Sequence, residues 1–104
     1  MATYGFHPEA LAEYQEAAGF YLERASALLA ASFIWEVEKA ISEIVASPET
    51  WRVIEDPGIR RYLIHRFPYA LYYRWESQHD RVAIYAVMHL HREPGYWKNR
   101  LAEA

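Results

Sequence analysis

Apolar residues recur at steps of three and four along the first half of the chain, a spacing typical of helices with one buried face. One series occupies residues 11–22 and a second occupies residues 29–45. Pro8 suits the first turn of the first helix, and Ser26 suits the N-cap of the second, where its hydroxyl can accept a backbone hydrogen bond. The pattern favours a helical hairpin that turns near residues 24–27, although spacing alone leaves one long helix open.

The apolar spacing changes from 3.6 to 2 after Pro48, which indicates a change from helix to strand. Segments rich in Tyr, Ile, Val and Phe then predict three antiparallel strands in a meander. We place them at residues 60–67, 69–76 and 81–90. Residues 3–7 also alternate and are expected to form an edge strand, residues 47–58 a connection, and residues 96–104 a short helix or tail.

The last strand indicates how the sheet is covered, because successive side chains of a strand point to opposite faces. One set is apolar throughout and is expected beneath the helices: Val82, Ile84, Ala86, Met88 and Leu90. The other set becomes polar towards its end and is expected on an accessible face: Ala83, Tyr85, Val87, His89 and His91.

Length and composition predict a single globular domain over residues 1–104, with 53% hydrophobic and 24% charged residues. No apolar run is long enough to span a membrane, and no secretory signal begins the chain, so we expect a cytoplasmic protein. With no cysteine there is no thiolate site. We expect no cofactor and no metal.

The net charge of −3 hides an asymmetry between the two halves of the chain. Residues 1–52 hold three basic and eight acidic side chains, whereas residues 53–104 hold eight basic and six acidic ones. Any anionic partner is therefore expected at the second half.

Four residues near the end of the last strand could carry out acid–base chemistry: His89, His91, Arg92 and Tyr96. Imidazole can transfer a proton near neutral pH, guanidinium can stabilise a phosphate, and a phenol can orient or donate. A metal-independent ribonuclease needs these groups, although a histidine at a strand end can equally be structural. His89 and His91 could also be zinc ligands, but His65 is the only near third candidate and no site is predicted.

Further cationic residues are candidates for contact with a target or substrate. Arg61 and His65 share a face of the first meander strand, where the alternative is an edge strand protected by charge. Arg74 stands among aromatic residues and could stack on bases or simply pack. Arg92 is a candidate contact too, as is Trp97.

Two blocks of the second half resemble RelE/ParE toxins of bacterial type II toxin–antitoxin systems, often labelled plasmid stabilisation proteins. The first is Arg60-Arg61 followed by Phe67-Pro68-Tyr69, and the second joins Ala86-Val87-x-His89 to Arg92-x-Pro94-x-Tyr96-Trp97. The pattern Phe6-His7-Pro8-Glu9-Ala10 with later residues of the first helix is similar too, so the resemblance covers nearly the whole chain.

The resemblance implies an α+β fold in which an N-terminal helical hairpin packs on a twisted antiparallel sheet. It implies a cognate antitoxin that wraps the toxin across its helices and sheet edge. The target differs by branch: ParE-like members poison DNA gyrase, whereas RelE-like members cleave mRNA on the ribosome with sheet-face basic residues and a C-terminal Tyr. Homodimers and toxin–antitoxin hetero-oligomers both remain open.

The acidic character of the chain and the near absence of lysine from the strands favour the ParE-like branch. We therefore expect a toxin that binds and inhibits a macromolecular target such as gyrase, which would not be an enzyme. The alternatives are a ribosome-dependent endoribonuclease that uses His89, His91, Arg92 and Tyr96, and an inactive relative that only binds antitoxin.

Overall fold

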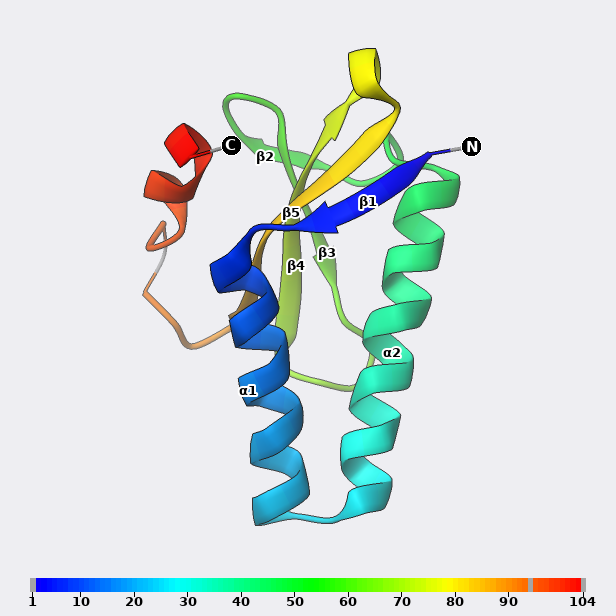
Figure 1. Ribbon diagram of the computed structural model, residues 1–104, viewed down its shortest axis with the longest axis vertical. Coiled ribbons are helices and arrows are strands. Elements are labelled where there is room, and N and C mark those ends of the chain that lie inside the picture. Colours follow the sequence, from blue (N-terminus) through cyan, green and yellow to red (C-terminus); the bar gives the residue numbers. More distant parts are fainter. Residues whose placement is uncertain (1, 94, 104) are drawn as a thin grey trace.

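The computed structural model describes residues 2–93 and 95–103 and consists of two helices packed on a five-stranded sheet (Figure 1). The strands are β1 (Thr3–Phe6), β2 (Val53–Glu55), β3 (Ile59–Leu63), β4 (Tyr69–Glu76) and β5 (Arg81–His89). The helices are α1 (Pro8–Arg24) and α2 (Ala27–Ala46), with short 3₁₀ turns η1 (Ser77–His79) and η2 (Lys98–Glu103). The expected α+β fold is confirmed.

The helical hairpin turns where the sequence predicted it. Ser26 is the N-cap of α2, and its Oγ accepts a hydrogen bond from the Leu29 N–H at 3.0 Å. At the start of α1, His7 Nδ1 accepts from the Glu9 N–H at 3.1 Å, and Pro8 occupies the first turn, where a missing N–H breaks no helical bond. Each helix therefore begins at its own N-cap, His7 for α1 and Ser26 for α2, so the segment forms two helices and not one.

The sheet is mixed, which corrects the expectation of an antiparallel one. Its order is β1-β5-β4-β3-β2, and β1 runs parallel to β5 while the other pairs are antiparallel. Only a tight hairpin obliges neighbouring strands to run in opposite directions. Because β1 joins β5 through the rest of the fold, it is free to pair in parallel.

Three further strand boundaries differ from the sequence prediction. The short strand β2 lies inside the expected connection, where three residues give too little alternation to detect. β3 ends at Leu63 because Arg66 adopts a φ of 72°, which turns the chain towards β4. β5 ends at His89, one residue earlier than predicted. Pro94, part of the second family-like block, lies outside the described residues.

A β-bulge in β5 reverses the predicted faces of its second half. Tyr72 pairs with Ala86 and Tyr73 with Ile84, so Tyr85 is an extra residue. The helix-side core contains Val82, Ile84 and Val87, while Ala86 and Met88 lie in the core of the other face. Alternation was right before the bulge and wrong after it.

Both faces of the sheet are buried, so the prediction of one accessible face is wrong. The second face carries its own core of Ile59, Ala70, Tyr72 and Tyr85, and Trp97 closes it with 1% of its surface exposed. The predicted C-terminal short helix or tail is η2, which lies on the side of the sheet away from α2 (Figure 1).

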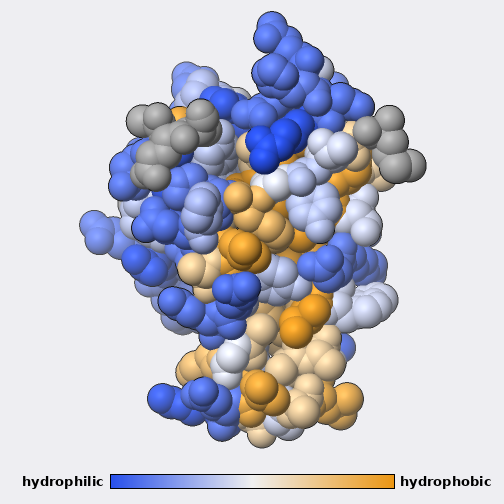
Figure 2. Space-filling view, in the orientation of Figure 1, coloured by the Kyte–Doolittle hydropathy of each residue, from blue (hydrophilic) through white to orange (hydrophobic). Residues whose placement is uncertain are grey.

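The joined ends of the two helices project beyond the sheet (Figure 1). Figure 2 shows apolar surface at this end, and Phe20, Leu22 and Leu28 are exposed there by 51%, 57% and 79%. Within the described residues, no helix combines the length and apolar character that crossing a membrane requires.

Candidate functional site

The open edge of β5 is completed by side chains instead of by a strand. β1 pairs with β5 only as far as Ile84, after which the chain turns into α1. Beyond that point the Val87 N–H donates to Glu13 Oε1 at 3.1 Å, and Arg100 donates to the Tyr85 carbonyl at 2.9 Å. A carboxylate and a guanidinium thus satisfy backbone groups that would otherwise be buried without partners.

Glu13 and Arg100 also bind each other through two parallel hydrogen bonds of 2.9 Å. This fork geometry is the strongest form of the carboxylate–guanidinium pair. The Arg100 side chain is 7% exposed and that of Glu13 14%, so the pair is largely removed from water. It ties η2 to α1, 87 residues earlier in the chain.

Tyr96 completes this group, which we call the anchor cluster (Glu13, Tyr96 and Arg100). Its hydroxyl donates to Glu13 Oε2 at 2.6 Å, and the guanidinium of Arg92 lies 4.0 Å from its ring centroid. Burial and then the Glu13 carboxylate raise the pKa of the Tyr96 phenol. Tyr96 is therefore held as a neutral donor to a residue of its own chain.

The four candidate catalytic residues do converge, although on the helix side of the sheet. His89, Arg92 and Tyr96 line a hollow of about 200 Å³ between α1 and the end of β5. His91 is adjacent: its N–H donates to His89 Nδ1 at 3.1 Å, and the two rings lie 5.1 Å apart. The bulge in β5 places His89 here, stacked edge-on against Tyr69 at 5.0 Å.

The same hollow is lined by two carboxylates, Glu13 and Glu16. Negative charge beside a general acid or base opposes the approach of a phosphodiester, because like charges repel more strongly in a partly enclosed site. Within the described part of the chain, no three His, Asp or Glu residues lie close enough to hold a metal ion. The chemistry of this hollow suits proton transfer better than phosphate binding.

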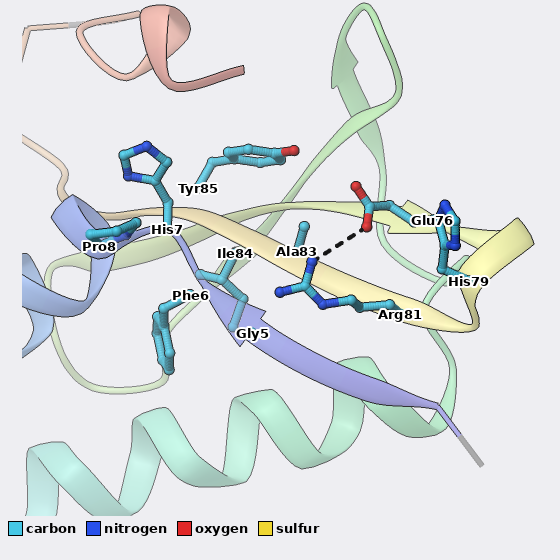
Figure 3. Close-up of a pocket in the computed structure, with 10 residues that line it drawn as sticks. All are labelled: Gly5, Phe6, His7, Pro8, Glu76, His79, Arg81, Ala83, Ile84 and Tyr85. Atoms are coloured by element: carbon cyan, nitrogen blue, oxygen red, sulfur yellow. Dashed lines mark ion pairs between the residues drawn. The ribbon is translucent and has the colours of Figure 1, made fainter. Parts of the chain in front are cut away.

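Arg74 lies on the opposite face, beside a second hollow of about 550 Å³ shown in Figure 3. Its guanidinium is 3.1 Å from Glu76, which also pairs with Arg81 at 3.6 Å inside the hollow. The ring of Tyr85 lies 5.7 Å from Arg74, and its buried hydroxyl has no hydrogen-bond partner among the described residues. Arg74 therefore combines the predicted packing on an aromatic ring with an ion pair.

Arg61 and His65 are exposed and line one cleft at the edge of β3, away from the anchor cluster. Trp97 is not available for contact with a target, which corrects the sequence prediction. Its ring packs 5.1 Å from Tyr72 in the second core, where an indole contributes apolar burial. The candidate contacts are therefore spread over three places instead of forming one surface.

Comparison with known proteins identifies the family. The model of the family described as the ParE toxin of the type II toxin–antitoxin system parDE matches residues 4–94. The chain belongs to the ParE toxin family. No curated protein matches it closely enough to be counted.

Solved toxins share the fold of this ParE-family chain. A chain of the chromosomal ParDE system from P. aeruginosa matches with a TM-score of 0.71 at 17% identity, covering 86% of this chain and 96% of that one. The isolated E. coli RelE toxin matches with a TM-score of 0.63 at 16% identity, covering 100% of both chains. At these identities the likeness concerns architecture.

Sequence reasoning on this ParE-family chain missed Glu13 and Arg100. A signal for Glu13 was present: it stands between Ala10 and Ala17, which are 0% and 5% exposed and share its helix face. A lone carboxylate on a buried helix face requires a cationic partner. No local pattern points to Arg100, since it lies in a short 3₁₀ turn.

Proposed function

We propose that this chain is a toxin that binds and inhibits a macromolecular target, with DNA gyrase as the first choice, in the cytoplasm. The observation that favours target binding over catalysis is the state of Tyr96, whose hydroxyl donates a hydrogen bond to Glu13 at 2.6 Å. A ribonuclease needs its acid or base free to reach the substrate. Here the phenol is engaged, and two carboxylates line the same hollow.

A second candidate is the ribosome-dependent endoribonuclease. It is favoured by the meeting of His89, Arg92 and Tyr96 around one hollow, with His91 in ring contact. In this alternative the binding of mRNA would have to release Tyr96 from Glu13.

Pulse labelling of cells after induction separates the two candidates. A gyrase inhibitor stops DNA synthesis first, with loss of supercoiling and DNA breaks, and purified protein inhibits gyrase in a supercoiling assay. Early arrest of translation with cleaved mRNA would reject the gyrase proposal. The variant with His89 and Tyr96 both changed to Ala leaves every proposed target contact in place and should remain toxic, provided that its thermal unfolding shows a folded protein. Loss of toxicity in a folded variant supports the nuclease.

The antitoxin is proposed to cover the helical hairpin. Phe20, Leu22 and Leu28 expose apolar surface at its end (Figure 2), and Trp35 on α2 is 61% exposed. Burial of such a patch is favourable by about 25 cal/mol per Å². The double variant Leu22→Glu with Leu28→Glu should stay toxic but resist rescue by the neighbouring antitoxin gene, whereas Leu90→Glu, 44% exposed elsewhere, should be rescued. Equal rescue of both variants would exclude this surface.

The contact with the target is proposed to involve Arg61, His65, Arg74 and Arg92. Arg61, His65 and Arg92 are exposed, but the Arg92 guanidinium lies on the Tyr96 ring and Arg74 pairs with Glu76. Assembly as a homodimer or as a hetero-oligomer with antitoxin would be decided by light scattering of the toxin alone and of the pair.

A further inference from the structure

A cleft of about 620 Å³ lies beside β3, the segment before β2 and the turn that follows β3. We call it the arginine cleft. Three arginines, Arg52, Arg61 and Arg66, line it together with His65, and Trp51 and Tyr62 form its aromatic wall. Ile54, Leu63 and Ile64 complete the lining, so the cleft contains no Asp or Glu. This is a concentrated positive site on a chain whose net charge is −3.

The arginines of the cleft differ from every other cationic side chain of the protein. The chain has 11 Lys and Arg residues. Within the described structure, the others place their cationic groups against a carboxylate, a backbone carbonyl or an aromatic ring. Arg52, Arg61 and Arg66 have no such partner, and all three line the arginine cleft. Like charges gathered without counter-charges are unfavourable for folding, which points to an external anion.

The walls of the cleft are fixed by bonds outside it. Arg60 donates to the Glu49 carbonyl at 3.0 Å and to the Trp51 carbonyl at 2.7 Å, which ties the segment before β2 to β3. The Tyr62 hydroxyl donates to the Glu43 carboxylate of α2. The cleft is thus held open by contacts that leave its own arginines unused, and little ordering remains to be done on binding.

The turn that carries Arg66 is strained. Its φ of 72° lies in the left-handed region, which is unfavourable for a residue with a Cβ. Glycine would fit this turn without strain. An arginine at such a position, exposed and unpaired, agrees with a role in binding better than with one in folding.

We propose that the arginine cleft binds a single-stranded nucleic acid, with phosphates on its arginines and a base against Trp51. Guanidinium groups match phosphate oxygens with two parallel hydrogen bonds. Trp51 is only half-buried, with its ring 4.9 Å from that of Tyr62, and aromatic side chains beside a positive groove are the usual platform for unpaired bases. An acidic peptide would use the arginines but leave the aromatic wall without a partner. The inference does not depend on gyrase as target.

The test measures fluorescence anisotropy of labelled single-stranded DNA and RNA of one sequence against purified protein over a range of salt. Three phosphate contacts predict a salt slope of about −2 in log–log form, because each contact on a single strand contributes about −0.7. The double variant Arg61→Gln with Arg66→Gln should lose at least tenfold in affinity and retain a slope of about −0.7. Binding of DNA, of RNA or of both supports the shared phosphodiester chemistry, and a preference identifies the sugar.

The matched control is Arg24→Gln with Lys39→Gln, which removes the same two charges from exposed positions on the helices. It should keep affinity within twofold. An equal loss of affinity in both double variants would show that the effect comes from net charge alone, and it would overturn the proposal. Failure of the unmodified protein to bind either strand at low salt would overturn it too, as would tighter binding of a polyglutamate peptide. Thermal unfolding checks that both variants are folded.

Discussion

The anchor cluster and the arginine cleft differ in whether their arginine side chains are paired within the chain. At the anchor cluster Arg100 binds Glu13 with two bonds of 2.9 Å and a backbone carbonyl with a third, so both of its terminal nitrogens are bonded within the chain. At the arginine cleft the guanidinium groups of Arg52, Arg61 and Arg66 have no partner among the described residues, and all three side chains are exposed. Removing one partner of a buried pair is strongly destabilising, whereas exposed unpaired cations contribute little to the fold and remain free to bind.

This contrast separates residues that stabilise the protein from residues that act. The candidate catalytic hollow belongs with the first kind, because Tyr96 and Glu13 line it and bind each other. The arginine cleft belongs with the second kind. Substitutions in the two regions should therefore affect different measurements, stability in one and binding in the other.

The largest effect is expected from Glu13→Ala. Removing the carboxylate leaves the buried Arg100 guanidinium with the Tyr85 carbonyl and, at 3.4 Å, the Glu9 carboxylate as its remaining polar partners among the described residues. It also leaves the Val87 N–H without an acceptor. The free energy of unfolding should fall by about 3 kcal/mol, the lower end of the cost of breaking a buried pair. Urea denaturation measures the change. Glu16→Ala is the matched control, since Glu16 lines the same hollow but is exposed, and it should stay within about 0.5 kcal/mol. Equal effects of the two would mean that the pair does not anchor the C-terminal segment.

Tyr96→Phe should lower the free energy of unfolding by about 2 kcal/mol, the contribution of a hydrogen bond to a charged acceptor. Under the proposed function its toxicity should persist at a temperature where the variant is folded. Tyr69→Phe, whose hydroxyl makes no hydrogen bond within the described structure, is the control and should be near neutral. Complete loss of toxicity in folded Tyr96→Phe would mean that Tyr96 takes part in the function of the toxin and does not only stabilise the fold.

The sequence was sufficient for the α+β class and the two helices but not for the assignment of sheet faces. Helix spacing and the cap at Ser26 predict α1 and α2 because these signals are local. The bulge at Tyr85 has no local signature, since it depends on how β5 pairs with β4. It turns His89 to the helix side, so the four candidate residues lie together but on the face opposite to the predicted one.

Long-range pairs were also beyond the reach of the sequence. Glu13 and Arg100 are 87 positions apart, and nothing local joins them. The parallel pairing of β1 likewise follows from the closure of the whole sheet rather than from the alternation within Thr3–Phe6. By contrast Arg61 and His65 were placed together correctly, because both lie near the end of β3.

Unlike the substitutions in the anchor cluster, Arg66→Gly in the arginine cleft should raise the stability of the protein while weakening its binding of nucleic acid. Glycine relieves the strain of a φ of 72° at the expense of a more flexible unfolded chain, for a net gain of about 0.5–1 kcal/mol in urea denaturation. Arg66→Ala removes the same charge but keeps the strain, so it should show no gain. A gain with Ala equal to that with Gly would attribute the effect to charge repulsion in the cleft.

The smallest effect concerns alkaline pH and tests Tyr62, the wall of the arginine cleft. Burial, followed by the hydrogen bond to Glu43, raises the pKa of Tyr62 to about 12, whereas an unfolded phenol titrates near 10. Below pH 10 the phenol is neutral in both states and its contribution is complete. Between pH 10 and 12 only the unfolded chain loses this proton, so the free energy of unfolding falls as pH rises.

Thermal unfolding at pH 9, 10, 11 and 12 tests this reasoning. The stability of Tyr62→Phe should decline less steeply with pH than that of the unmodified chain. Burial also raises the pKa of Tyr73 to about 12, so the free energy of unfolding of Tyr62→Phe should still decline in part over this pH range. Identical declines in the two proteins would mean that Tyr62 is not held by α2, and the preorganised wall of the cleft would lose its support.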